Sequence, residues 1–549
     1  MANADVDDVA ADEVVSALGN ASGRRLVVFT GDLNYTVRRN IVDLDARSPG
    51  LEWLVLIHSP PRSIGRLVKN QRANLRKHGL RWIPYQVSDI AARLGSRRSL
   101  DPGPQAPGGE FEEAALRARS NLRIRRVADI HAGESLALVA EFAPDLGLSL
   151  AAPILKPALF KLPRLGTINL HKGKLPEFRG MPPAFWELWT GQTSVGCSVH
   201  WVNEKLDAGA LIHQAQLPCS RWSTPRGMQL GLDELGADLM CGATEDILNG
   251  RSSAMAQPSG AGKTYRKPSL AQEAELRRRL SGLLPNRQPA WKRALKDVHA
   301  RWAFAWYRWL GWRIAQPRIT VLLYHRVSDD ARDNLTVGIE QFERQMRLLR
   351  EHCEVLSIEQ VLAMASPWRG RRPLVAVTFD DGYLDNYSKA APILRRHRVP
   401  CAFFVSTGIV ASDRRFPHDV RRGNPPIDMM NWDHLRQMRD WGFTIGSHTV
   451  EHIDCVAESE DRVRSELARS RDDLVRELGP LMPVFAYPYG GRHQMNRDRL
   501  ALVRKAGYAA CLSAYGGSNV GSVDPWNILR RGIHWEFSNA SFLRQCLGT

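Results

Sequence analysis

The chain has 549 residues, which is too long for one hydrophobic core and predicts about two or three domains. Its composition, 44% hydrophobic and 24% charged, is that of an ordinary globular protein, and no stretch reaches the roughly 18 uncharged apolar residues of a transmembrane helix. The net charge of +17 favours nucleic acid, an anionic membrane surface or a phosphorylated substrate as partners, although solubility alone also explains a basic surface.

The first 22 residues are predicted to form a loose leader. This segment is acidic and lacks a basic region followed by an apolar run, so we expect no secretory signal. The eight cysteines are scattered and include no C-x-x-C pair, which predicts reduced thiols rather than a disulfide framework or a structural zinc site. We therefore expect a cytoplasmic protein.

From residue 23, short apolar runs alternate with helical patterns. The runs at 26–30 and 51–57 read as strands, and a basic helical segment follows the second of them. This alternation is typical of an α/β domain with a parallel sheet. A loop rich in Gly and Pro, residues 101–109, interrupts it.

A short buried strand is predicted over residues 166–171, after a Pro-rich loop. It would deliver Asn169 and His171 at its carboxyl end, where ligands bind in open α/β sheets. Two positions apart, the two side chains face the same side and can reach one carbonyl oxygen. Asp207 could hold the imidazole charged or relay a proton. Such a set suits acyl transfer to an amine, which needs donors for the oxyanion and an acceptor for the amine proton. Each residue alone also has a purely structural explanation.

The segment 257–264 resembles half of a phosphate-binding loop. Gln257 stands where that motif requires its first glycine. We therefore predict a polar connection that closes the first domain near residue 270.

Residues 271–318 form a bridge of unusual composition. On a helix, one stripe collects seven large apolar side chains: Trp291, Leu295, Val298, Trp302, Trp306, Trp309 and Trp312. Basic residues flank it: Lys292, Arg293, Lys296, Arg301 and Arg308. Two interpretations remain open. The stripe packs on a neighbouring domain, or residues 291–312 lie in a membrane interface as a basic amphipathic helix.

A second alternation of apolar runs and helical segments follows residue 317. The runs are 319–324, 374–379, 401–405, 443–446 and 484–487. Candidate catalytic residues follow directly after these runs. Catalytic residues take the same positions at the carboxyl-terminal face of a (β/α) barrel.

A second polar set suits metal-assisted hydrolysis. Asp380 and Asp381 follow a buried strand, where adjacent carboxylates repel each other unless something offsets their charge. His448 and His452, four positions apart, are expected to face the same way on one helical turn. Asp381 would complete a metal site that keeps open positions, leaving Asp380 as the base that activates water.

The first region resembles the formyltransferase family, which uses 10-formyltetrahydrofolate. The resemblance covers about residues 24–268 and rests on ordered blocks: LPRLGTINLH at 162–171, LPEFRG at 175–180 and LDAGALI at 206–212. It implies that Asn169, His171 and Asp207 are catalytic. It also implies that a loop lines the folate pocket, namely Pro153, Ile154 and Leu155. Where the family commonly has Pro-Ser-Leu, this chain has residues 172–174, Lys-Gly-Lys, whose two lysines could bind a phosphorylated acceptor.

The second region resembles the polysaccharide deacetylase (NodB-homology) family over about residues 319–540. The matching blocks are YHRV at 324–327, TFDDGY at 378–383, SHTVEH at 447–452 and FAYPYG at 485–490. The resemblance implies a distorted (β/α) barrel and a divalent ion of the zinc type. The implied ligands are Asp381, His448 and His452.

The same resemblance implies roles for further residues. Asp380 would be the general base, and Tyr489 would offer its backbone N–H to the oxyanion. The family's usual Arg is replaced by Ala486. His534 is a candidate for the acid that acts late in the reaction, and the segment 524–526 is a candidate for the motif that orients the base.

The sequence as a whole predicts an α/β protein in which a Rossmann-like formyltransferase domain precedes a distorted barrel. The predicted segments are a leader at 1–22, a formyltransferase domain at 23–270, a linker helix at 271–318 and a deacetylase domain at 319–549. Such a chain would formylate an amino-sugar amine and remove an N-acyl group from a sugar, nucleotide- or lipid-linked, in surface-polysaccharide or glycolipid assembly. Two alternatives remain: formyl transfer to aminoacyl-tRNA, and a non-catalytic binding role for one domain.

Overall fold

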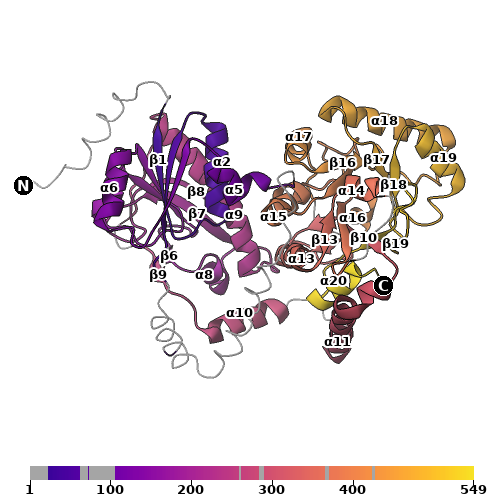
Figure 1. The fold of residues 1–549 in the computed structure, drawn as a ribbon, viewed down its shortest axis with the longest axis horizontal. Helices are drawn as coiled ribbons and strands as arrows, with labels where there is room; N and C mark the ends of the chain where they lie inside the picture. The colour runs from indigo at the N-terminus through magenta and orange to yellow at the C-terminus, as the bar shows by residue number, and fades with distance from the viewer. Residues whose placement is uncertain are drawn as a thin grey trace, which may run out of the picture. The chain divides into compact units, whose positions relative to one another are not determined.

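The protein is described by a computed structural model for residues 23–61, 72, 106–258, 261–282, 290–364, 370–422 and 427–548. The described residues fall into two compact units (Figure 1). Those within Met1–Ser88 and Glu110–Leu283 form the first, and those within Asp89–Gly109 and Leu284–Thr549 form the second. The predicted leader, the basic helical segment after residue 61 and most of the loop at 101–109 lie outside the described residues.

The first unit is built on a seven-stranded sheet in the order β3-β2-β1-β4-β5-β7-β8. Its strands are β1 (Arg25–Thr30), β2 (Glu52–His58), β3 (Leu122–Val127), β4 (Leu146–Ser149), β5 (Thr167–His171), β7 (Ser194–Trp201) and β8 (Leu211–Pro218). The first five strands in the sheet order are mutually parallel, as predicted. The parallel prediction is wrong for β7 and β8, which run antiparallel to their neighbours. A short connection joins β7 to β8, and only an antiparallel pair permits that.

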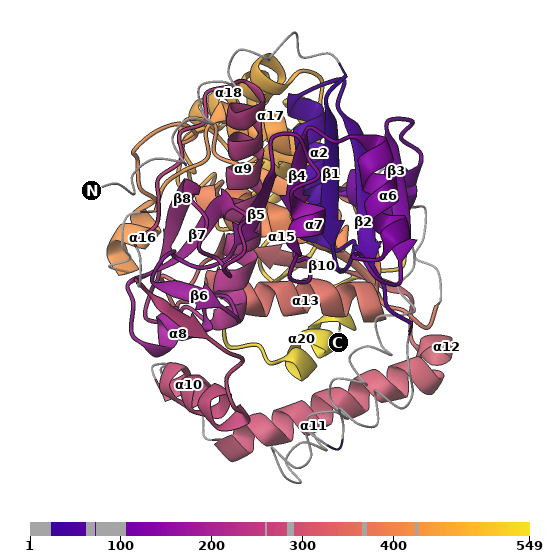
Figure 2. The same cartoon turned by 90° about the vertical axis from the view of Figure 1, so that its left-hand side faces the viewer.

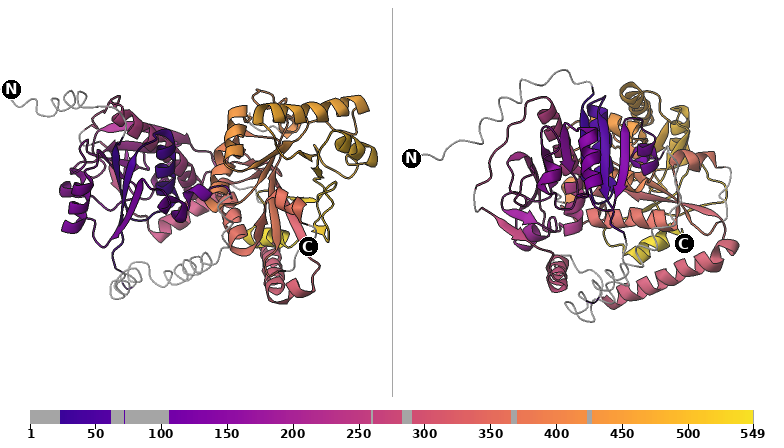
Figure 3. Two further views of the ribbon diagram at one scale, coloured as in Figure 1. Left: turned by 45° about the horizontal axis from the view of Figure 1, so that its top comes forward. Right: turned by 60° about the vertical axis from the view of Figure 1, so that its left-hand side comes forward.

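Helices cover both faces of this sheet (Figure 3). One face carries α2 (Tyr35–Arg47), α5 (Glu113–Arg117) and α9 (Pro225–Leu248), and the other carries α6 (Gly133–Phe142) and α7 (Pro157–Phe160). Because both faces are buried, the inner strands read as continuous apolar runs rather than alternating ones. The remaining elements near this unit are η3 (Gly109–Phe111), β6 (Phe178–Gly180), α8 (Phe185–Trp189), β9 (Lys263–Tyr265) and α10 (Leu270–Gly282).

The second unit is built on a strongly curled sheet that forms a half barrel, which is the form the predicted distorted barrel takes. Its main path is β18-β17-β16-β15-β14-β10-β19, with β13 beside β14 and β20 beside β10. The strands are β10 (Arg318–Tyr324), β13 (Glu354–Leu356), β14 (Leu374–Phe379), β15 (Ala402–Val405), β16 (Thr444–Ser447), β17 (Val484–Ala486), β18 (Ala510–Leu512), β19 (Asn519–Val520) and β20 (Arg530–Gly532). A separate pair joins β11 (Arg326–Val327) and β12 (Thr336–Val337).

Helices follow most of these strands and cover the sheet. They are α13 (Ile339–His352), α14 (Ile358–Ala363), η5 (Asn386–Ala390), α15 (Ala391–His397), α16 (Pro417–Arg422), α17 (Trp432–Asp440), α18 (Glu460–Leu478), α19 (Arg497–Lys505) and α20 (Asn539–Cys546). Several begin at a Ser or Asn whose side chain accepts a backbone N–H of the first turn, as Ser357, Asn431 and Ser459 do. Such caps explain where the helices start.

The bridge is helical over α11 (Ala290–Trp306), continues through a π-turn, η4 (Tyr307–Gly311), and ends in α12 (Trp312–Ile314). Figure 2 shows α11 as a long rod, and it lies against α20. The predicted stripe is exposed from Trp291 to Trp309, while Ala300 and Phe304 are buried instead. Of the two interpretations left open, packing of this stripe on the second unit is wrong, because the opposite face of α11 makes that contact. No helix in the described ranges is long and apolar enough to cross a bilayer.

Candidate active sites

The first candidate site lies at the carboxyl end of β5, as predicted. His171 is buried and Asp207 is half-buried, and His171 Nδ1 is 3.5 Å from Asp207 Oδ2. The same carboxylate oxygen accepts the N–H of Gly180 at 3.2 Å. Asp207 has a left-handed backbone, with φ of 50°, and its carbonyl accepts the side-chain amide of Gln257 at 3.1 Å. The structure thus brings Asp207 to His171 through a loop held by a residue 50 positions away.

The second nitrogen of His171 also has a partner. Its Nε2 is 2.8 Å from the carbonyl oxygen of Phe178, so Nε2 carries a proton and donates to it. Nδ1 lies 3.5 Å from the Asp207 carboxylate, so both ring nitrogens already face protein oxygen atoms. A formyl oxygen would have to share one of these donors, which the sequence did not indicate.

Asn169 has a partner that the sequence analysis missed, His200 on β7. The Asn169 side-chain nitrogen lies 3.1 Å from His200 Nε2, and His200 Nδ1 lies 2.8 Å from the carbonyl of Trp201. Burial lowers the pKa of His200, which favours a neutral ring that donates from Nδ1 and accepts at Nε2. His200 therefore fixes the orientation of the Asn169 amide. The antiparallel register, which sets Asn169 opposite His200, is the signal that could have found it.

The loop after His171 is shaped by Gly173. A Cβ atom there would stand 2.5 Å from His171 Nε2 and 2.6 Å from the carbonyl oxygen of Phe178, so only glycine lets the loop close over the ring. The flanking lysines both have carboxylate partners: Lys172 pairs with Asp233, and Lys174 lies 3.6 Å from Glu177. A phosphorylated acceptor would compete with these carboxylates.

The predicted folate loop is only partly exposed. Leu155 is buried, whereas Ile154 is 77% exposed and its carbonyl is 3.1 Å from His131 Nε2. Pro153 is half-buried. An exposed isoleucine beside a fixed loop is consistent with a surface that a flat, partly apolar ligand covers.

The second candidate site is organised by a buried ion pair. Asp380 follows β14, and both of its oxygens accept from the Arg530 guanidinium at 2.7 Å. Burial raises the pKa of Asp380, but Arg530 and His448 outweigh it, so the pKa lies below its ordinary value. Arg530 also donates to the carbonyl of Ser513 at 2.5 Å. The guanidinium offsets the repulsion expected between two adjacent carboxylates.

A divalent metal ion fits the neighbouring residues Asp381, His448 and His452. One ligand atom from each lies within 4.8 Å of the others, and all three are buried. His448 Nδ1 donates to the carbonyl of Ala486 at 2.8 Å, which leaves its Nε2 lone pair toward Asp381, 3.6 Å from Oδ1. Burial lowers the pKa of His448 to about 4, so the ring is in the neutral form that binds metals.

The remaining electrostatics also favour a cation at this point. Burial raises the pKa of Asp381, but its histidine neighbours outweigh it, so the carboxylate is ionised. Its Oδ2 and the Nδ1 of His452 have no hydrogen-bond partner among the described residues. A buried carboxylate requires a compensating positive charge, which a metal ion would supply.

His448 and His452 do not share a helical turn, contrary to the prediction. They lie in the loop after β16, where Thr449 has φ of 64° and His452 has φ of 52°. Asp381 and Tyr489 have positive φ as well, at 79° and 61°. Left-handed non-glycine residues are strained, and here they converge on one site. The loop brings the two ring centroids to 4.9 Å. A helical turn would also bring the two rings together, so the four-residue spacing in the sequence could not distinguish a loop from a helix.

Comparisons with known proteins match one family to each of the two units. Residues 102–244 match the family model described as formyl transferase, and residues 369–511 match that described as polysaccharide deacetylase. The chain contains a formyltransferase domain and a polysaccharide deacetylase domain. The formyltransferase domain belongs to the first unit and the polysaccharide deacetylase domain to the second.

Relatives of known name cover one domain each. Methionyl-tRNA formyltransferase of Geobacillus thermodenitrificans is 29% identical over 182 residues, or 33% of this chain and 54% of that protein. The enzyme of the same name from Listeria welshimeri is 32% identical over 164 residues, 30% of this chain and 50% of that protein. The chain thus spans about half the length of these relatives.

Solved structures that resemble the chain likewise cover one domain. IcaB from Ammonifex degensii is 24% identical, covers 42% of this chain and 96% of its own, and has a TM-score of 0.35. A sugar N-formyltransferase from a Shewanella species is 15% identical, covers 47% of this chain and 88% of its own, and has a TM-score of 0.29.

Other predicted residues of the deacetylase domain lie as follows. Tyr489 has its ring 5.0 Å from that of His452, and its backbone N–H has no acceptor among the described residues, which leaves it available to an oxyanion. The His534 ring lies 4.7 Å from the Phe537 ring in a tilted arrangement, and His534 has no ion pair with Asp380 or Asp381 in the described chain. In the segment 524–526, the Asp524 side chain accepts the N–H of Trp526 at 2.9 Å. The partner of Asp380 is instead Arg530, which the sequence analysis missed.

A third histidine, His418 on α16, also lies beside the metal ligands. Its Nε2 is 3.0 Å from the Tyr383 hydroxyl and 3.7 Å from Asp381 Oδ2. The Tyr383 hydroxyl donates to Asp419 at 2.6 Å, and Asp419 accepts from the buried Arg326 at 3.1 Å. This network lies beside the metal ligands. Tyr383 and Arg326 belong to the blocks TFDDGY and YHRV, whereas His418 comes from a segment without a recognisable motif and could not be predicted.

In the formyltransferase domain, a buried carboxyl group lies close to the first site. Glu187 lines a small cleft of about 10 Å³ that also borders Gly173, Gly180, Trp186 and Tyr265. The Glu187 Oε1 atom has no partner among the described residues, and burial raises the pKa of this group to about 7. The cleft therefore contains a carboxyl group that is largely protonated below neutral pH.

Replacing Arg530 should separate metal binding from catalysis. In Arg530→Met, Asp380 loses its partner while the three metal ligands remain, so we expect acyl hydrolysis to fall by about 100-fold or more, with zinc content unchanged. Arg531→Met, which removes the neighbouring guanidinium, is the matched control. Hydrolysis rates and bound zinc per folded chain are the measurements. An Arg530→Met protein with near-normal hydrolysis would contradict the assigned partnership.

Glu187 should make the stability of the formyltransferase domain depend on pH. The folded state keeps the proton up to about pH 7, whereas the unfolded chain loses it near pH 4.5, so stability falls as pH rises through this window. Glu187→Gln removes this loss, and its advantage over wild type should grow by up to about 3 kcal/mol between pH 5 and pH 8, at about 1.4 kcal/mol per pKa unit. Native-state hydrogen exchange in β7 and α9 measures it.

The exposed substitution Glu141→Gln on α6 is the control for this experiment. It should have the same small effect at both pH values. An equal advantage of Glu187→Gln at pH 5 and pH 8 would show that the Glu187 carboxyl group titrates normally.

Proposed function

We propose that this chain is a bifunctional enzyme that removes an N-acyl group from an amino sugar and formylates a sugar amine. The observation that carries the proposal is the presence, in one chain, of two complete sets of polar residues, one in each domain. One set suits building an amide and the other suits hydrolysing one. The common group is an amine on a sugar. We propose that the formyltransferase domain ends near residue 270 and that the deacetylase domain begins after residue 318.

In the formyltransferase domain, the proposed donor is 10-formyltetrahydrofolate, bound beside Pro153, Ile154 and Leu155. The acceptor nitrogen attacks the formyl carbon, the bond from that carbon to the folate nitrogen breaks, and the acceptor loses a proton. The Asn169 amide, oriented by His200, and the His171 ring donate hydrogen bonds to the oxyanion. The Asp207 carboxylate, 3.5 Å from His171, stabilises the charged ring or takes up the released proton.

In the deacetylase domain, we assign Asp381, His448 and His452 as ligands of a divalent ion, of the zinc type. When bound, such an ion polarises the amide carbonyl and acidifies water. The Asp380 carboxylate, held ionised by Arg530, accepts the proton of the attacking water. The backbone N–H of Tyr489 donates to the oxyanion. The C–N bond then breaks as the proton taken up by Asp380 passes to the leaving nitrogen, giving a free amine and a carboxylate.

We further propose that the acceptor is an amino sugar carried by a nucleotide or a lipid, and that the enzyme works in the cytoplasm on precursors of surface polysaccharide or glycolipid. The net charge of +17 supports a phosphorylated carrier, because nucleotide and lipid carriers both contain phosphate.

A second candidate function is formyl transfer to aminoacyl-tRNA. The identity of 29% to 32% with methionyl-tRNA formyltransferases favours it. The segment that follows the formyltransferase domain argues against the tRNA function. The resemblance leads us to expect a β-barrel there in a tRNA enzyme, whereas this chain continues into a Trp-rich helix and the deacetylase domain.

Two substitutions in the full chain should separate the activities. His171→Gln should lower formyl transfer to an amino-sugar nucleotide by about 100-fold or more and leave N-acyl hydrolysis unchanged. Asp380→Asn should do the reverse. Product masses, measured with an N-acetylated sugar, a free amino sugar and the formyl-folate donor, report both reactions. Each variant is the folding control of the other.

Three results would overturn the proposal. If wild type forms no formylated sugar but formylates methionyl-tRNA, the tRNA function holds. If one reaction is absent from wild type with every acceptor, that domain is a binding module. If both variants lose both activities, the two sites are not independent.

A further inference from the structure

The exposed face of α11 is an apolar stripe outside both active sites. Its members are Trp291, Leu295, Val298, Trp302, Trp306 and Trp309. Successive members are three or four positions apart, so they occupy one face of a helix with 3.6 residues per turn. Trp302 is 72% exposed and Trp309 is 79% exposed. Soluble proteins rarely expose so many large apolar side chains in a row.

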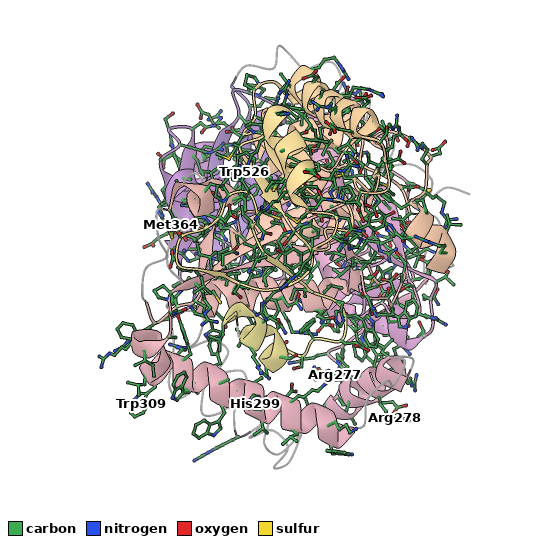
Figure 4. All side chains as sticks on the ribbon, turned by 90° about the vertical axis from the view of Figure 1, so that its right-hand side faces the viewer. Arg277, Arg278, His299, Trp309, Met364 and Trp526 are labelled. Carbon is green, nitrogen blue, oxygen red and sulfur yellow. The ribbon has the colours of Figure 1, made fainter. Side chains whose placement is uncertain are left out.

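The opposite face of α11 is fixed to the deacetylase domain. Ala300 and Phe304 are buried, and the Phe304 ring lies 5.7 Å from that of His352. Asp297 accepts from Ser538, and His299 contacts Arg544 at 3.0 Å. In Figure 4, His299 lies toward α20, whereas Trp309 points away from the domain. The stripe is therefore held outward by a helix that already has its intramolecular partner.

The charges around the stripe have one sign. Residues 290–314 contain six basic side chains and one acidic side chain, Asp297, which points to α20. Lys292 and Arg301 are exposed and flank the stripe on its two sides. The helix thus presents an apolar centre with basic margins and keeps its one carboxylate turned away.

We propose that α11 docks the protein on an anionic lipid surface. Indole rings combine a large apolar area with an N–H donor, which suits the boundary between headgroups and acyl chains. Lysine and arginine at the margins meet the negative headgroups. The helix lies in the plane of the interface, with the stripe inserted and the α20 side facing water.

This docking goes beyond the proposed function and does not depend on it. Its failure can be recognised separately, because hydrolysis and formyl transfer on water-soluble acceptors do not require the stripe.

Vesicle binding by the full chain tests the proposal. We expect wild type to sediment with vesicles of phosphatidylcholine containing about 30% phosphatidylglycerol, and much less with pure phosphatidylcholine. The double substitution Trp302→Glu and Trp309→Glu should reduce partition at least 10-fold and leave both activities on soluble acceptors unchanged. Lys292→Gln and Arg301→Gln should each reduce binding to the anionic vesicles about 5-fold, which corresponds to about 1 kcal/mol per basic residue.

A matched control introduces the same two charges elsewhere. Met255 and Val475 are exposed apolar residues outside α11, and the double substitution of both to Glu should bind vesicles as wild type does.

Three results would overturn the proposal. The first is equal binding by wild type and the Trp302/Trp309 variant. The second is equal binding of wild type to neutral and anionic vesicles. The third is wild type that ignores vesicles but forms a dimer, with the Trp variant monomeric, which would make the stripe an interface between two copies of the chain.

Discussion

The pairing of Asp380 with Arg530 is the interaction on which the deacetylase site depends. Two adjacent carboxylates, Asp380 and Asp381, are buried at the end of one strand. Leaving either without compensation would cost several kcal/mol. Arg530 neutralises the first through two hydrogen bonds of 2.7 Å, and three histidines surround the second. This division gives the carboxylates different chemistry, because one can accept a proton and the other is left to bind a cation.

In the formyltransferase site, a single carboxylate, that of Asp207, likewise needs hydrogen-bond donors or positive charge beside it. Asp207 is its only carboxylate among the described contacts of His171, and it receives the Gly180 N–H and lies near two imidazoles. Both sites stand at the carboxyl ends of strands, where loops can depart from regular geometry. Asp207, Asp381 and His452 all have positive φ. In both domains, a regular sheet therefore supports a strained loop that presents the reactive groups.

Much of both sites could be predicted, because their central residues are close in sequence. Asn169 with His171, Asp380 with Asp381, and His448 with His452 are each recognisable from local spacing after an apolar run. The partners that orient them are not local. Arg530 is 150 positions from Asp380, and His200 is 31 positions from Asn169. Only the sheet registers β5–β7 and β10–β20 bring them near. Glu187 and His418 belong to no local sequence pattern that would predict a role in either site.

The sequence left two features undecided for the same reason. A four-residue spacing fits a helical turn and a loop equally well. The residue types of Thr449 and His452 do not predict the positive φ angles that both adopt. The Trp stripe was visible in the sequence, but periodicity identifies an apolar face and not what covers it. The contacts of α11 with α20 decide that the other face is the buried one.

The central claim is that one chain holds two separate sites of opposite chemistry, only one of which needs a metal ion. Removing metal with a chelator from the full-length protein, and measuring both reactions on the same sample, tests it most directly. We expect that N-acyl hydrolysis is lost, that formyl transfer continues at its original rate, and that one equivalent of zinc restores hydrolysis. Hydrolysis that persists in the metal-free protein, or formyl transfer that disappears with the metal, would contradict it.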